Sequence, residues 1–152
     1  ITGSITHANA AVAADAAAFC VVTSAAFAAG RDGMEILGGA TLGSDPTCPG
    51  LDPVAAIARA LQNNGHSPAQ IDVAEIMEAY AVQAIACVQE AGLDPARVNI
   101  GGGALARGHP IGASGAINAV RLYHSLLQRG GGKGLAAIAA AGGIGSALIL
   151  RA

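Results

Sequence analysis

The sequence predicts an α/β domain in which a mixed sheet is covered by helices on both faces. Apolar segments of strand length alternate with amphipathic segments of helical length, and the last two apolar segments are joined by a short glycine-rich turn. The chain has 152 residues, of which 53% are hydrophobic and 12% charged, which is enough for one domain with its own core. No repeat or second domain is visible, so residues 1–152 are treated as one unit.

The first half of the chain contains three predicted strands and two predicted helices. The strands are expected over Ala16 to Thr23, where Phe19, Val21 and Val22 favour extended structure, over Met34 to Leu42, and over Ile71 to Met77. The first helix has Asp52 as its expected N-cap and Pro53 as its first residue, and it ends near Gly65. The second is expected over Tyr80 to Ala91, before Gly92.

The second half contains a glycine-rich loop, one helix and two strands. The loop runs from Gly101 to Gly115, and Ser114 is the expected N-cap of a helix that continues to about Arg129. The helical spacing predicts that the inward side chains are Ile117, Val120, Tyr123 and Leu127. Strands are expected over Leu135 to Ala141 and over Ser146 to Leu150.

The composition excludes several functional classes. Eight Lys and Arg residues without a basic run, and a net charge of −2, do not provide the clustered positive charge of a nucleic-acid surface. The most apolar stretches are rich in alanine and glycine and do not predict a membrane span, and no basic segment precedes them as in a signal peptide. So few charges on an apolar chain indicate an oligomer in which another chain covers one face.

The three cysteines do not predict a disulfide framework or a metal site. Cys20, Cys48 and Cys87 are odd in number, far apart, and without Cys-x-x-Cys or Cys/His ligand spacing, so the cytoplasm is the expected compartment. Cys48 lies in a proline-rich loop and is the cysteine expected to be exposed. Cys20 and Cys87 are expected in the core.

The segment from Asn99 to Gly115 carries the most specific signal in the chain. It contains Asn-x-x-Gly-Gly-x-aliphatic-small-x-Gly-His-Pro-x-Gly-x-Ser-Gly and resembles the thiolase family. Gly134 to Ala147 is similar to the last motif of that family, and Gly3 to Asn9 to the start of its C-terminal domain. The resemblance covers nearly the whole chain but only the second half of a thiolase. It implies a thiolase half-fold with a five-stranded mixed sheet.

The resemblance also implies a chemistry. Thiolases form or cleave a carbon–carbon bond between acyl-CoA units: one acyl group is carried by a cysteine, and a second acyl-CoA loses an α-proton. His109 is then expected to donate to the thioester oxygen of the enolate, and the backbone N–H of Ala141 to contribute to a second oxyanion hole. Gly108, Met77 and Ser114 are expected next to the substrate, although a helix cap explains Ser114 equally well. The coenzyme A thioester is the substrate, and no other cofactor and no metal are expected.

Several positions differ from the family pattern. Ala139 stands where thiolases carry the cysteine that takes the α-proton, Met77 where an asparagine holds a water, and Ala11 where a serine lies near the pantetheine. The acylated cysteine belongs to the N-terminal half of the family, and Cys48 has no neighbour in sequence that would activate it as a nucleophile. Glu78 is a candidate for the missing base, and its alternative role is a structural hydrogen bond.

Two hypotheses follow from these observations. In the first, the chain is the C-terminal half of a thiolase-like acyltransferase and works with a chain that carries the N-terminal half and the nucleophilic cysteine. In the second, it is a catalytically silent subunit that binds coenzyme A thioesters or stabilises an active partner. The complete Gly-His-Pro motif favours the first hypothesis, and Ala139 and Met77 favour the second.

Overall fold

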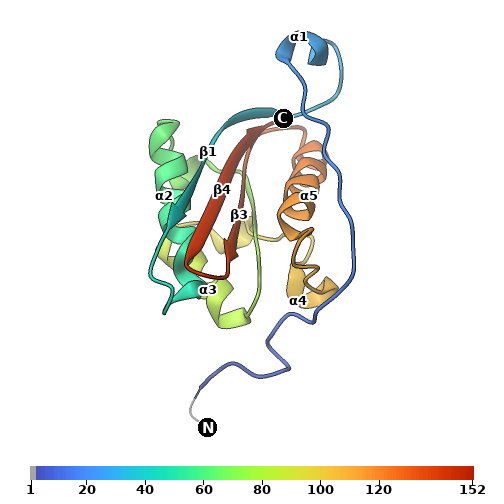
Figure 1. Ribbon diagram of the computed structural model, residues 1–152. Helices are drawn as coiled ribbons and strands as arrows, with labels where there is room; N and C mark the ends of the chain where they lie inside the picture. Colours follow the sequence, from blue (N-terminus) through green and yellow to red (C-terminus); the bar gives the residue numbers. More distant parts are fainter. Residues whose placement is uncertain (1–2) are drawn as a thin grey trace.

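A computed structural model describes residues 3–152 and contains a four-stranded mixed sheet with helices on both faces (Figure 1). The strand order is β1-β4-β3-β2, with β2 parallel to β3 and β4 antiparallel to both of its neighbours. The strands are β1 (Glu35–Gly43), β2 (Val73–Ile76), β3 (Lys133–Ala140) and β4 (Ile144–Arg151). The predicted α/β class is confirmed.

The helices form one layer on each side of the sheet. On one face lie α2 (Asp52–Asn63) and α3 (Ala81–Glu90), and on the other lie α5 (Ser114–Arg129) and the short α4 (Ala104–Arg107) (Figure 1). The remaining helical segments are short. They are α1 (Ala25–Ala28), η1 (Pro49–Leu51), η2 (Pro68–Gln70) and η3 (Pro95–Arg97).

Each helical layer packs against the sheet through its own apolar cluster. Successive side chains of a strand point to opposite faces, so Leu135 and Ala137 of β3 pack toward α2 and α3, whereas Ala136 packs toward α5. The first cluster is the larger and includes Ile57, Leu61, Ile76, Cys87, Val88 and Ile149. The second contains Val73, Leu122, Leu126, Ala136 and Leu150. Burial on both faces explains why β3 is apolar throughout.

The inward face of α5 differs from the predicted one. Its buried residues are Ser114, Asn118, Leu122, Ser125 and Leu126, and the prediction of Ile117, Val120, Tyr123 and Leu127 is wrong. Polar contacts fix the rotation of this helix, because Asn118 Nδ2 donates to the carbonyl oxygen of Ala137 at 3.4 Å. Close packing of Leu122 against Gly134 of β3 also fixes the rotation. A Cβ on Gly134 would lie only 2.6 Å from Leu122 Cδ1, so the leucine fits there because residue 134 has no side chain.

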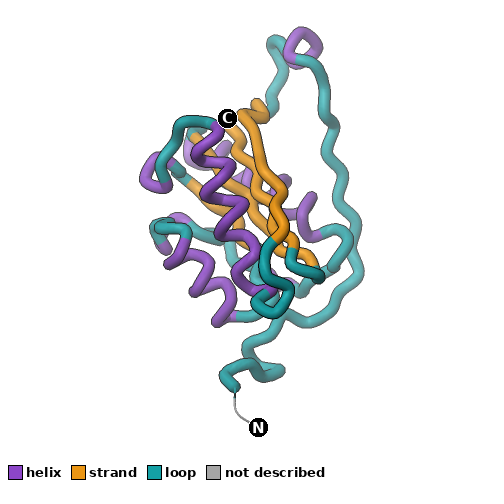
Figure 2. The backbone as a smooth tube through the Cα atoms, turned by 60° about the vertical axis from the view of Figure 1, so that its left-hand side comes forward, coloured by secondary structure: helices purple, strands orange, loops and turns teal. Residues whose placement is uncertain are grey.

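The strand predicted over residues 16–23 is absent, and with it the count of five strands. The structure assigns no strand there, and Phe19, Val21 and Val22 are 88%, 89% and 74% exposed. This part of the chain runs along the outside of the molecule, past α4 and α5, to α1 (Figures 1 and 2). Strand propensity reflects packing against neighbouring strands, and this segment has no such neighbour here.

A different segment extends the sheet beyond β2. Val98 forms a single parallel bridge with Ala74, and the next residue, Asn99, donates its backbone N–H to the Ala74 carbonyl at 2.8 Å. Asn99 has a φ of 49°, which turns the chain away from the sheet. The glycine-rich motif therefore begins directly at the sheet edge.

Most predicted element boundaries hold to within a few residues, but the predicted N-cap residues do not. Gly65 and Gly92 follow their helices at φ of 64° and 65°, as predicted for C-terminal caps. The N-cap of α2 is Leu51, because Asp52 already belongs to the helix. The Asp52 side chain is instead buried and accepts a hydrogen bond from the Ser44 hydroxyl.

Candidate functional site

The Gly-His-Pro segment lies between α4 and α5, against the N-terminal part of the chain. Gly108 ends α4 at a φ of 90°, and a Cβ there would lie 2.8 Å from Ala14 Cβ and 3.2 Å from the Val12 carbonyl oxygen. Only glycine combines this conformation with so close an approach. The backbone N–H of His109 then donates to the Val12 carbonyl at 2.8 Å. The loop is therefore held against the N-terminal segment at Gly108 and at the histidine itself.

Ser114 holds the ring of His109. Its Oγ lies 2.7 Å from Nδ1 of His109 and 3.0 Å from the carbonyl oxygen of Pro110. The N-cap of α5 is Ala113, so the prediction that Ser114 caps this helix is wrong. Ser114 is also fully buried in this chain, which leaves its side chain no direct contact with a ligand. Among residues 3–152, the other ring nitrogen, Nε2, forms no hydrogen bond.

The surroundings favour the neutral form of His109. Burial lowers the pKa of the half-buried imidazole below its ordinary value, and the positive charge of Arg107 lowers this pKa further. A neutral histidine can present either a lone pair or an N–H at Nε2, so it can accept a proton or donate to a developing oxyanion. The role expected of His109 requires the second of these capabilities.

Glu78 is bound on both carboxylate oxygens. Oε1 accepts from Asn99 Nδ2 at 2.7 Å, and Oε2 accepts from the backbone N–H of Leu105 at 3.1 Å. Gly103 makes room for it, since a Cβ there would lie 2.0 Å from the carboxylate. These bonds join the segment after β2 to the glycine-rich loop. Of the two roles expected for Glu78, general base or structural hydrogen bonding, they correspond to the second.

Two of the positions expected to differ from thiolases are Met77, directly after β2, and Ala139, near the end of β3. Met77 is 3% exposed and packs in the core, where its thioether cannot hold a water in an open site. Ala139 is half-buried near the end of β3, opposite Gly145 of β4, and Ala141 is exposed in the turn that follows. A Cβ on Gly115 would lie 4.0 Å from Ile138 Cγ2, so the end of β3 lies beside the start of α5.

A buried charge cluster supports the loop, and the sequence-based interpretation missed it. Glu75 of β2 is fully buried, and burial raises the pKa of its carboxyl, although the ion pair with Arg121 opposes the shift. Arg121 Nη2 also donates to the Gly102 carbonyl at 2.6 Å, and Arg107 Nη2 donates to Asn118 Oδ1 at 3.1 Å. The sequence contains one sign of this cluster: a glutamate within the apolar strand segment before Met77. An unpaired buried carboxylate is costly, so a glutamate at this position predicts a basic partner elsewhere in the chain.

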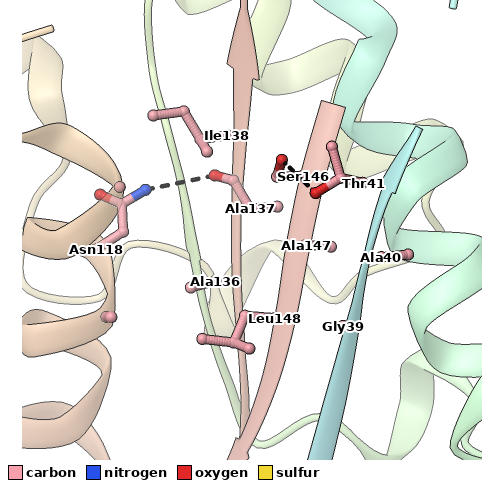
Figure 3. Close-up of a pocket in the computed structure, with 12 residues that line it drawn as sticks. Gly39, Ala40, Thr41, Asn118, Ala136, Ala137, Ile138, Ser146, Ala147 and Leu148 are labelled. Carbon is pink, nitrogen blue, oxygen red and sulfur yellow. Dashed lines mark hydrogen bonds between the residues drawn. The ribbon is translucent and has the colours of Figure 1, made fainter. Parts of the chain in front are cut away.

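A groove of about 440 Å³ lies between α5 and the sheet, next to this site (Figure 3). It crosses β1, β4 and β3, and its lining includes Gly39, Ala40, Asn118, Ala136, Ala147 and Leu148. Its polar groups bond among themselves: the hydroxyls of Thr41 and Ser146 lie 2.9 Å apart, and Asn118 donates to Ala137 (Figure 3). Gly115 lines the groove directly after Ser114, whereas His109 is outside it.

The cysteines follow the prediction in part. Cys87 is buried and donates to the Gly50 carbonyl at 3.0 Å, and burial raises the pKa of its thiol. Cys48 is exposed, as predicted, but the prediction that Cys20 lies in the core is wrong because its segment is outside the sheet. Among residues 3–152, no group of three potential ligands could hold a metal ion. Over the same range, every helix is too short or too polar to cross a membrane.

Comparison with known proteins gives one consistent result. The family described as thiolase, C-terminal domain, matches residues 33–152. This chain belongs to the thiolase family. It is 45% identical over 152 residues to an acetyl-CoA acetyltransferase of Pseudomonas aeruginosa, covering 97% of this chain and 38% of that protein. It is 39% identical over 153 residues to the cytosolic acetyl-CoA acetyltransferase of Rattus norvegicus, covering 99% and 38% respectively.

Solved thiolase structures share the fold. The acetyl-CoA acetyltransferase of Bacillus anthracis has a TM-score of 0.76 and 40% identity, over 78% of this chain and 30% of that one. Human mitochondrial 3-ketoacyl-CoA thiolase in complex with CoA has a TM-score of 0.75 and 38% identity, over 77% and 30%. The chain thus spans well under half the length of its relatives.

Proposed function

We propose that this thiolase chain takes part in acyl transfer between coenzyme A thioesters, as Claisen condensation or thiolysis of 3-ketoacyl-CoA. The observation that carries the proposal is the setting of His109. Ser114 holds its ring, the loop is bonded to Val12, burial and Arg107 lower the pKa of the imidazole, and Nε2 has no hydrogen-bond partner within residues 3–152. Charge that develops on a thioester oxygen must be met by such pre-placed donors. The named activities of its relatives support the same chemistry.

In this proposal, His109 is the side-chain donor and Ala141 contributes its backbone N–H. Ala141 is exposed in the β3–β4 turn, at the surface of this chain. Gly108 keeps a side chain out of the space beside the histidine. The coenzyme A thioester is the only small molecule required, and the cytoplasm is the compartment we propose for the reaction.

The nucleophilic cysteine comes, in this proposal, from a partner chain or segment that carries the N-terminal half. The chain spans only 38% of the length of its curated relatives, which leaves room for such a half. Two apolar surfaces are available to it: the groove between α5 and the sheet, and the exposed side chains of Phe19, Val21 and Val22. Large exposed apolar patches of this kind are typical of interaction sites.

The second candidate is a catalytically silent thiolase-fold subunit. Its support comes from Ala139, whose methyl group cannot move a proton, and from Met77, whose buried side chain cannot hold the water of an oxyanion hole. A silent subunit would still bind coenzyme A thioesters or stabilise an active partner. The two candidates differ in whether His109 contributes to turnover.

The test is a thiolysis assay with acetoacetyl-CoA on the chain combined with its N-terminal half, for the parent and for His109→Ala. Loss of one oxyanion donor is expected to lower kcat about 10²- to 10³-fold. His124→Ala is the matched control, because His124 is exposed on α5. Equal activity of the parent and His109→Ala would support the silent subunit.

A further inference from the structure

The hydroxyl of Ser114 lies between two hydrogen-bond partners, the carbonyl oxygen of Pro110 and Nδ1 of His109, but has a single proton to donate. A carbonyl oxygen only accepts, so a bond to Pro110 uses that proton, and Nδ1 of His109 must then carry hydrogen and donate to Oγ. In the alternative arrangement the hydroxyl donates to Nδ1, and the ring hydrogen is on Nε2. The same heavy-atom positions therefore satisfy both neutral tautomers of His109.

The cost of changing between these arrangements is small. The Pro110 carbonyl also accepts from the backbone N–H groups of Ala113 and Ser114, both at 2.9 Å. When the hydroxyl turns from Pro110 toward His109, that carbonyl keeps two donors, so no buried acceptor loses its last partner. A carbonyl with no other donor would hold the hydroxyl in one arrangement.

Other contacts keep the ring in place while its proton is redistributed. The backbone N–H of His109 is bonded to Val12, and the ring is half-buried beside Arg107, the charged group that acts on it. These contacts favour the neutral ring, for which the tautomer is the remaining variable. Which form Nε2 presents to the site then depends on the hydrogen bond between Ser114 and the other ring nitrogen, Nδ1.

We propose that Ser114 is a positioning residue that shares its hydroxyl proton between Pro110 and His109, so that neutral His109 is populated both with a lone pair and with a hydrogen at Nε2. The form with the lone pair can accept a proton, and the form with the hydrogen can donate to an oxyanion. This use of both forms rests on the proposed function. The sharing itself does not, because Ser114 is buried and acts only through His109.

The direct test is the 15N NMR signals of the histidine rings in the full chain at pH 8.5, where the neutral forms dominate. A free imidazole prefers the Nε2–H tautomer, and the exposed His124 provides that reference in the same chain. We expect a larger proton share on Nδ1 at His109 than at His124. An equal or smaller share at His109 would mean that Ser114 only donates, and the proposal would be overturned.

Two variants extend the test. Ser114→Ala should lower the Nδ1 share at His109, while Ser114→Thr, which keeps a hydroxyl, should preserve it. Ser125→Ala is the matched control, as a buried serine on the same helix. An unchanged Nδ1 share in Ser114→Ala would contradict the proposal.

Kinetics separate this role from the proposed function. With the N-terminal half present, Ser114→Ala should lower kcat about 10-fold, the loss of one hydrogen bond, with KM little changed because Ser114 does not touch substrate. Ser114→Thr should recover most of this loss. Absence of turnover in the parent would reject the proposed function but leave the NMR result intact, whereas turnover without any effect of Ser114→Ala would reject the positioning role alone.

Discussion

The guanidinium Nε of Arg121 donates to Oε2 of Glu75 at 3.1 Å and thereby ties α5 to β2. The Glu75 side chain is 1% exposed, so its charge has lost nearly all of its water. The second oxygen, Oε1, has no hydrogen-bond partner among the described residues, which makes the carboxylate depend on Arg121. Because Arg121 also holds the Gly102 carbonyl, the ion pair connects the core to the loop that presents His109.

Arg121→Met should therefore be strongly destabilising. Removal of one partner from a buried ion pair leaves an uncompensated charge and costs about 3–5 kcal/mol. Denaturant unfolding followed by circular dichroism measures the loss. Arg129→Met is the control, because the Arg129 ion pair with Asp72 is exposed and spans 4.0 Å, for which a change below about 1 kcal/mol is expected. A similar effect of both variants would contradict a special role for Glu75.

The chemistry of the pair also predicts a rescue. In Arg121→Met, a second change, Glu75→Met, removes the carboxylate that has lost its partner and should recover most of the lost free energy of unfolding, since apolar replacements of buried ion pairs are often neutral. Denaturant unfolding of the double variant is the measurement. A double variant no more stable than Arg121→Met alone would locate the effect in the Gly102 contact.

Gly108→Ala tests the fit between the Gly-His-Pro loop and the N-terminal segment. The alanine would adopt a φ of 90° with its Cβ 2.8 Å from Ala14 Cβ, so the backbone of one segment must move. We expect a loss of at least about 1–2 kcal/mol in unfolding free energy, together with displacement of His109. Gly112→Ala in the same loop is the control, because a Cβ there meets nothing within 4 Å. Equal losses would contradict this account of Gly108.

The predictions that hold depend on local signals. Alternating apolar segments and helix-ending glycines specify β1, β3, β4, α2 and α3, and the Gly-His-Pro motif specifies the position of His109. These patterns are set by residues close together in the sequence.

The predictions that fail depend on partners distant in sequence. Phe19, Val21 and Val22 have strand propensity, yet no neighbouring strand pairs with them. The contact of Ser114 with His109 replaces a cap that spacing alone favoured, and Asn118 sets a helix rotation that hydrophobic periodicity does not contain. Glu75 of β2 and Arg121 of α5, which form an ion pair, are 46 residues apart in the sequence. Propensity and periodicity carry no information on such contacts.

The pKa of His109 predicts how activity depends on pH. Burial, then the charge of Arg107, lower this pKa below the ordinary value near 6.5, so the neutral ring persists as the pH falls through 6.5. As the pH is lowered, kcat is therefore expected to begin to fall only below pH 6.5, and this fall is the acid limb of the pH profile. Arg107→Met removes the neighbouring positive charge and should move this limb upward, whereas Arg59→Met, an exposed change on α2, should not. A limb unaffected by Arg107→Met would contradict the influence of Arg107 on His109.

Ala139→Cys tests whether proton transfer limits the reaction. The resemblance to thiolases implies a general base at this position, and a methyl group cannot replace it. In the proposed complex, condensation and thiolysis should then be slow, while acylation of a cysteine on the N-terminal half persists. Mass spectrometry of the complex with acetyl-CoA should then detect an acyl-enzyme, and Ala139→Cys should raise the steady-state rate by about 10²- to 10⁴-fold.

Ala140→Cys is the matched control for this change, because residue 140 is the next position along β3 and its side chain points to the opposite face of the sheet. A rate increase confined to Ala139→Cys would place the missing base at position 139. Fast turnover of the parent complex, with no gain from Ala139→Cys, would instead mean that a different group takes the α-proton. Because both oxygens of Glu78 already accept hydrogen bonds, that group would then be expected on the partner.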